Sequence, residues 1–161
     1  VDPLVLNGVE ARNKKQKQYL FEQIVARMGK DLEGRRICVW GLAFKPDTDD
    51  MREASSIDLI RALCFAGAEV RAHDPVAHDV ARQIFADLIR HGKLVIEADP
   101  LVAATDADAV VLVTEWAEYK TIDFSAVKAT VRDAVVFDGR NHLDHELLKK
   151  LGFHYTGIGR A

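Results

Sequence analysis

The sequence has few of the residues that mark specialised classes of protein. Among 161 residues it contains 2 Cys, 4 Pro and 7% aromatic residues. Two cysteines, Cys38 and Cys64, cannot build a disulfide framework, and this is typical of proteins from a reducing compartment. No apolar run approaches the roughly 20 residues that a membrane-spanning helix needs. Val1-Asp2-Pro3 does not open a signal peptide, so we expect a cytoplasmic protein that does not bind membranes.

The charge balance excludes a second set of functions. Lys plus Arg number 22 and Asp plus Glu number 25, which gives a net charge of −3. A strongly basic nucleic-acid-binding domain is therefore excluded. Hydrophobic residues make up 48% of the chain, as in ordinary globular domains. The length fits one domain, and the missing initiator Met leads us to expect a piece of a longer protein.

Short apolar runs alternate with helical patterns from residue 35 onward. Several of the runs, such as 109–113 and 134–137, are apolar on both faces, which is typical of strands buried in a parallel sheet. We therefore predict an α/β fold with a doubly wound, Rossmann-like sheet of about six strands, in the order 3-2-1-4-5-6. The predicted strands are 36–40, 69–73, 94–96, 109–113, 134–137 and 153–155, and the predicted helices are 55–66, 77–91, 100–104, 124–130 and 145–151.

The first 34 residues have a different character. Residues 4–30 contain no Pro and show only a thin apolar stripe at helical spacing, while residues 12–18 are polar on every side. This pattern predicts one long exposed helix. We divide the chain into a linking helix, 1–34, and an α/β domain, 35–161. The lysine-rich stretch 14–17 is interpreted as a solvated helix face.

The segment after the first predicted strand is the main candidate for a site, because ligands of such sheets bind beyond the carboxyl ends of the strands. A dinucleotide-binding loop needs G-x-G-x-x-G here, whereas the sequence has only Gly41. A phosphate at this edge would therefore depend on side-chain charges, from Lys45, Arg52 and Arg140. The alternative is a solvated acidic surface loop. Ser55 and Asp58 have the spacing of a capping box and predict the start of the next helix.

The sequence carries several motifs in order, which are Asn13-x-x-Gln16-Lys17, the loop from Gly41 to Ser55, Asp74-Pro75, Thr114-Glu115-Trp116, Phe137-Asp138-Gly139-Arg140-Asn141 and the closing segment 152–160. Together these motifs resemble the C-terminal domain of the UDP-glucose/GDP-mannose dehydrogenase family, over nearly the whole chain. The forms Glu115-Trp116 and Arg140-Asn141 favour the UDP-glucose branch.

The resemblance implies a function for the whole enzyme and a role for this part. Such enzymes oxidise UDP-glucose to UDP-glucuronate with two NAD, through a thioester on a cysteine that belongs to another domain. NAD is held mainly by an N-terminal domain, and the C-terminal domain, here residues 35–161, binds UDP. The implied substrate contacts are Lys45, Arg140 and Phe44, although a core or interface contact is an equal alternative for Phe44. Arg52 matches an arginine that reaches the cofactor.

The resemblance also implies partners and leaves alternatives open. The partners are UDP-glucose, the remaining domains of the same polypeptide and a second copy in a homo-oligomer, with no nucleic acid. The fragment alone is expected to be inactive. The alternatives are the C-terminal domain of a GDP-mannose or UDP-N-acetylmannosamine dehydrogenase, a stand-alone nucleotide- or CoA-binding regulatory module, and a purely structural or oligomerising domain.

No catalytic residue and no metal site is predicted within the chain. Cys38 lies in a predicted strand and Cys64 on the inner face of a predicted helix, where a thiol is inert. The histidines do not have the spacing of a recognised metal site. Gly157-Ile158-Gly159 resembles half of a dinucleotide fingerprint, but no helix follows it. The histidines considered are His73 and His78, beside Asp74, and His142 and His145.

Overall fold

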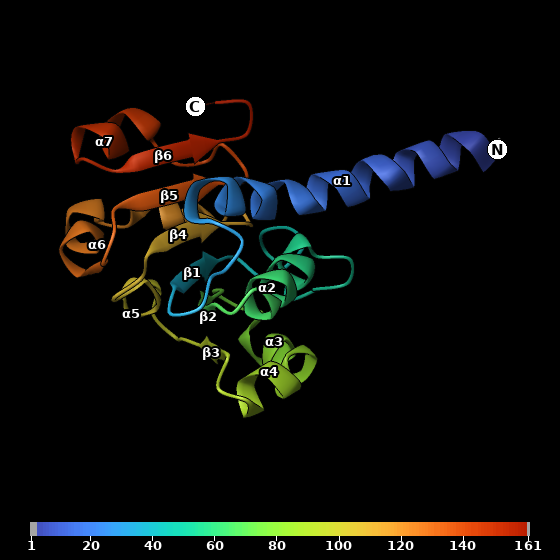
Figure 1. Ribbon diagram of the computed structural model, residues 1–161, viewed down its shortest axis with the longest axis horizontal. Helices are drawn as coiled ribbons and strands as arrows, with labels where there is room; N and C mark the ends of the chain where they lie inside the picture. Colours follow the sequence, from blue (N-terminus) through green and yellow to red (C-terminus); the bar gives the residue numbers. More distant parts are fainter. Residues whose placement is uncertain (1–2, 161) are drawn as a thin grey trace.

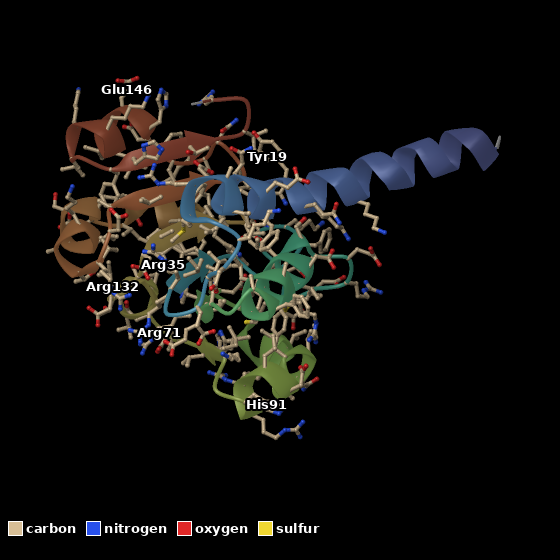
Figure 2. All side chains as sticks on the ribbon, in the orientation of Figure 1. Tyr19, Arg35, Arg71, His91, Arg132 and Glu146 are labelled. Carbon is tan, nitrogen blue, oxygen red and sulfur yellow. The ribbon has the colours of Figure 1, made fainter. Side chains whose placement is uncertain are left out.

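The computed structural model describes the backbone of residues 3–160 (Figure 1) and the side chains of Lys14 and residues 17–160 (Figure 2). A single sheet of six parallel strands runs through it in the order β3-β2-β1-β4-β5-β6, which confirms the predicted α/β fold and strand order. None of the described helices combines the length and hydropathy of a membrane span. The strands are β1 (Arg36–Trp40), β2 (Glu69–His73), β3 (Leu94–Ile96), β4 (Ala109–Leu112), β5 (Val135–Asp138) and β6 (His154–Gly157).

Helices cover both faces of this sheet (Figure 1). Helices α1 and α2 pack on each other over one face, and α5 packs on β1, β2 and α6 over the other. This layering buries the central strands on both sides, as the continuous apolar run of β4 requires. The helices are α1 (Pro3–Met28), α2 (Ser55–Phe65), α3 (His78–Ile84), α4 (Ala86–Arg90), α5 (Pro100–Ala104), α6 (Phe124–Thr130) and α7 (His145–Lys150), with a 3₁₀ turn η1 at Ala117–Thr121.

The core is densest beside the central strands. All of β4 and β5 is buried, and Trp40 at the end of β1 is fully buried. The Trp40 ring stacks on Tyr119 with 5.3 Å between ring centroids, and its Nε1 donates to the Pro100 carbonyl at 3.1 Å. Trp40 therefore fixes both η1 and the start of α5 against the sheet.

Helix α1 is attached to the domain by its C-terminal part. Ile24 is fully buried, and Leu20, Phe21 and Met28 pack against the core. The N-terminal part projects away from the sheet (Figure 1). The helix ends at Met28, two residues earlier than the pattern predicts, and Gly29 follows it with φ +91°. The division into a linking helix and a UDP-binding domain stays a prediction.

Two helix predictions are wrong in detail. The predicted helix 77–91 is two helices, because Phe85 leaves helical geometry at φ −103°, ψ 22°, with its ring fully buried in the core. Ser55 caps nothing: α2 begins at Ser55 itself, and Ala54 precedes it without a side-chain cap. The hydroxyl of Ser56 instead donates to the Leu42 carbonyl at 2.6 Å.

The last strand also lies one residue later than predicted. Phe153 donates its backbone N–H to the Leu148 carbonyl, at the end of α7, and is therefore outside the ladder. The ladder begins with His154, whose N–H donates to Ala134. Small differences of this kind arise because hydrophobicity alone does not decide which backbone groups pair.

Gly41 brings the loop after β1 into close contact with Thr114, in the segment that follows β4. Its φ is +89°, and its N–H donates to the His73 carbonyl at 2.8 Å. A Cβ at this position would lie 2.5 Å from Thr114 Cβ and 2.6 Å from Thr114 N. Only glycine fits both the backbone conformation and the space.

We predict that Gly41→Ala lowers the free energy of unfolding by about 3 kcal/mol, the sum of a positive-φ penalty and overlap with Thr114. Gly92→Ala is the matched control, since Gly92 has φ +70° but nothing within 4 Å of a new Cβ. It should lose only about 1 kcal/mol. Urea denaturation measures both, and equal losses would show that contact with Thr114 is unimportant.

Candidate functional site

The polar segments singled out in the sequence meet at the carboxyl edge of the sheet. A cavity of about 180 Å³ opens there, between α1, the first turn of α2 and the ends of β4 and β5. It is smaller than the roughly 300–1,000 Å³ of pockets that enclose a small ligand. The lining residues are Lys17, Leu20, Ser55, Leu59, Val113, Gly139, Arg140 and Ile158.

Arg140 is the predicted site residue that lines this cavity. Its Nε donates to the Val113 carbonyl at 2.8 Å and lies 3.1 Å from Glu115 Oε2. Its backbone N–H donates to the Asp138 carboxylate at 3.0 Å. The side chain is 38% exposed. These contacts orient the guanidinium at the edge and leave it partly open to a ligand.

Lys17 brings a second cation to the same cavity. Its Nζ lies 3.1 Å from Glu53 and 3.7 Å from Asp58, and its side chain is only 22% exposed. The interpretation of this lysine as part of a solvated helix face is therefore wrong. The helix packs closely here, since a Cβ at Gly139 would lie 2.7 Å from a Leu20 methyl carbon. The signal in the sequence was the motif that ends in Gln16-Lys17.

The loop that carries Phe44 and Lys45 is closed on itself. Phe44 donates its N–H to the Asp50 carbonyl at 2.9 Å, and Met51 is 1% exposed. The loop is therefore more than a solvated acidic stretch. Phe44 is 39% exposed, so its ring lies outside the core. Lys45 is also exposed, with Nζ 5.3 Å from the centre of the Phe44 ring.

Arg52 lies in a different hollow from Arg140. Its Nη2 is 2.7 Å from Asp50 Oδ2, and its side chain is 90% exposed. This shallow hollow has a volume of about 600 Å³ and includes Ile57 and Val80. The structure thus separates the residue expected at the cofactor from the residue expected at the substrate.

Two buried carboxylates organise the edge, and residue patterns alone did not assign them a role. Asp74 Oδ2 accepts from the N–H groups of Leu42 at 2.7 Å and Ala43 at 3.0 Å, and from Trp116 Nε1 at 3.1 Å. Its Oδ1 accepts from the N–H groups of the two residues that precede α3, at 2.9 and 2.8 Å. The only sequence signal was the motif Asp74-Pro75.

Asp138 acts in the same way at the end of β5. Its oxygens accept from the N–H groups of Arg140, His142 and Leu143 and from the Tyr155 hydroxyl, all within 3.0 Å. Burial, and then the charge of Asp138, raises the pKa of Tyr155. The Tyr155 hydroxyl therefore stays protonated and serves as a donor to the carboxylate.

Neither cysteine has the surroundings of a nucleophile. Cys38 is fully buried and Cys64 is 8% exposed. Burial raises the pKa of Cys38 well above its ordinary value and that of Cys64 to about 11. Both thiols are therefore protonated at neutral pH, which disfavours attack on a substrate.

The histidines considered as metal ligands are engaged elsewhere. His73 Nδ1 lies 3.0 Å from the Tyr119 hydroxyl, and burial lowers the His73 pKa. His142 Nε2 lies 2.9 Å from the Trp116 carbonyl. Within the part of the chain whose side chains are described, no three His, Cys, Asp or Glu side chains form a group able to hold a metal ion.

Known proteins resemble this chain over almost its full length. Residues 38–145 match the UDP-glucose/GDP-mannose dehydrogenase family, UDP binding domain. A UDP-glucose 6-dehydrogenase of Pseudomonas aeruginosa is 42% identical over 159 residues, which are 99% of this chain and 35% of that protein. One of Bacillus subtilis is 35% identical over 156 residues, 97% of this chain and 32% of that protein.

Solved structures agree with these relatives. A UDP-glucose dehydrogenase from Pyrobaculum islandicum aligns with a TM-score of 0.77 and 31% identity, over 96% of this chain and 32% of that one. The chain thus spans about a third of the length of the relatives it matches. The family match, the sequence identities and the fold all agree. The chain belongs to the UDP-glucose/GDP-mannose dehydrogenase family, as its C-terminal UDP-binding domain.

Proposed function

We propose that this chain holds the UDP portion of UDP-glucose within a UDP-glucose 6-dehydrogenase, which oxidises that substrate to UDP-glucuronate with NAD. The observation that carries the proposal is the position of Lys45 and Arg140. Both follow strands of the sheet at its carboxyl edge, where ligands of doubly wound folds bind. The 42% identity to a relative named UDP-glucose 6-dehydrogenase favours this branch of the family.

The side chains suit a nucleotide diphosphate. Lys45 offers three N–H donors on a compact charge, and Arg140 offers a planar fork that matches phosphate oxygens. The exposed Phe44 ring provides an apolar face for the nucleoside. Because the adjoining cavity is small, the rest of the polypeptide completes the pocket in this proposal.

The residues present fit a peripheral contact with NAD only. When bound, NAD would accept the hydride, and a separate domain would hold most of it. After β1 this chain has Gly41 but no further glycine of a phosphate-cradling turn. Arg52 is the proposed contact, since its guanidinium is exposed and held outward by Asp50. We also propose that the protein acts in the cytoplasm as a homo-oligomer.

We predict that Lys45→Ala and Arg140→Ala each weaken UDP binding by roughly tenfold or more, the usual loss for a charge-assisted hydrogen bond. Calorimetric titration of the full natural protein with UDP measures this, with GDP as the competing nucleotide. Lys149→Ala, which removes an exposed cation on α7, is the control. Unchanged UDP affinity in both site variants, or tighter binding of GDP than of UDP, would contradict the proposal.

We also expect the 161-residue chain alone to form no NADH from UDP-glucose and NAD. It lacks a glycine-rich cradle, and both of its thiols are buried and protonated. NADH fluorescence measures the outcome, with the full natural protein as the positive control and circular dichroism to verify folding. NADH formation above background by the short chain would show that the domain holds a complete active site.

The Asp50–Arg52 pair gives a prediction of pH dependence. Arg52 lowers the pKa of Asp50 from 3.8 to about 2, first by a side-chain hydrogen bond. A carboxylate with a lowered folded-state pKa stabilises the fold above its unfolded-state pKa, and this contribution is lost as pH falls toward 2. An NMR titration of the Asp50 carboxyl should therefore show a midpoint near pH 2.

Arg52→Ala should raise that midpoint toward 3.8. Arg82→Ala is the matched control, because Arg82 is an exposed arginine paired with Asp79 in α3. It should leave Asp50 unchanged. A wild-type midpoint near pH 4 would mean that the ion pair does not form in solution and that Arg52 is not held in place.

A further inference from the structure

One buried carboxylate joins three neighbouring strand ends. Asp74 follows β2 and is 1% exposed. In the sheet, β1 lies between β2 and β4. Asp74 reaches the loop after β1 through Leu42 and Ala43, and the segment after β4 through Trp116, all with the single atom Oδ2. The positions of these two segments are thus tied to one oxygen.

The loop after β1 leads directly to Lys45. Ala43, whose N–H donates to Asp74, is two residues before that lysine. The carbonyl of the same residue accepts from the Thr114 hydroxyl at 2.5 Å. The base of the loop is therefore fixed from both sides, by Asp74 and by Thr114 in the segment after β4.

The segment after β4 contacts Arg140 through a side chain. Glu115 lies between Thr114 and Trp116, and its Oε2 is 3.1 Å from Arg140 Nε. The Trp116 ring, 8% exposed, holds this segment in place through its N–H bond to Asp74. A shift of Trp116 would therefore displace Glu115, the ion-pair partner of Arg140.

We propose that Asp74 is a positioning residue for UDP binding, which sets the Lys45 loop and the Glu115–Arg140 pair relative to each other. It acts through these residues and does not touch the ligand. The inference rests on the proposed function, because it assumes that Lys45 and Arg140 bind UDP. The inference gives a role to Asp74, which the Asp74-Pro75 motif alone does not explain and which does not line the cavity beside Arg140.

Asp74→Asn tests this with little change of volume. An amide has one acceptor oxygen, and its NH₂ group would face N–H donors on one side. Either the three donors at Oδ2 or the two at Oδ1 lose their acceptor. We expect UDP to bind roughly three- to tenfold more weakly, which corresponds to the loss of about one net hydrogen bond.

Asp108→Asn is the matched control. Asp108 is also buried, at 2% exposure, and accepts from Arg36 N at 2.8 Å and Arg132 Nη1 at 3.0 Å. It lies just before β4, at the opposite edge of the sheet. It should lower thermal stability, as Asp74→Asn does, but leave the affinity for UDP unchanged.

Two further variants keep the test informative if Asp74→Asn folds poorly. Trp116→Phe removes the indole N–H donor, together with part of the ring volume, and should also weaken UDP binding. A double-mutant cycle of Trp116→Phe or Asp74→Asn with Arg140→Ala or Lys45→Ala should be non-additive, because the paired residues act as a unit. Additive losses would contradict positioning through these cations.

Amide hydrogen exchange separates this inference from the proposed function. In the full natural protein, the Leu42 and Ala43 amides should exchange faster in Asp74→Asn than in Asp108→Asn, with or without UDP.

If wild type binds UDP and Asp74→Asn binds it equally well, the inference is overturned and the proposed function stands. If wild type binds no UDP, the proposed function fails, and UDP positioning by Asp74 fails with it. Unchanged exchange would show that Asp74 does not fix the loop at all.

Discussion

The structure depends on the need to satisfy backbone N–H groups where the parallel strands end. Beyond the last ladder bond the chain turns, and buried N–H donors there would be costly without an acceptor. Asp74 and Asp138 supply these acceptors from the ends of β2 and β5. Each carboxylate accepts several hydrogen bonds from the loops that follow the strands, so these two buried groups fix the positions of those loops.

This arrangement divides the edge into a buried anionic layer and a more exposed cationic one. The acidic groups accept hydrogen bonds from N–H groups and from the Tyr155 hydroxyl, while Lys45 and Arg140 are exposed on the segments that those groups hold. A dinucleotide fold usually presents phosphate to a glycine turn and a helix N-terminus. Here the loop between β1 and α2 is longer and presents side-chain charge instead, which fits the proposed contact with a UDP moiety.

The sequence alone predicts the sheet and its order because the strands are short, the central ones are mostly apolar, and helical patterns separate them. It does not predict the helix break at Phe85, since the apolar spacing continues through that residue. Nor does it show that Ser56 rather than Ser55 bonds the preceding loop, because that choice depends on a carbonyl fourteen residues away. These details depend on tertiary contacts that the periodicity of a sequence does not contain.

The meeting of polar segments at the carboxyl edge of the sheet was predictable from the sequence, whereas the organisation of that edge was less so. Charged residues after β1 and β5 identify the edge, whereas the placement of Lys17 depends on how α1 packs on the domain. The five bonds to Asp74 connect segments up to 42 residues apart, so no local pattern reveals them.

The central claim is that this domain holds UDP at the carboxyl edge of its sheet. The most direct measurement is an NMR titration of the isotope-labelled full natural protein with UDP, followed by backbone amide shifts. The account predicts that the largest changes fall in residues 42–45, 114–116 and 139–141. Changes centred on the opposite edge, at 34–36, 106–108 and 132–133, or no saturable change at all, would contradict it.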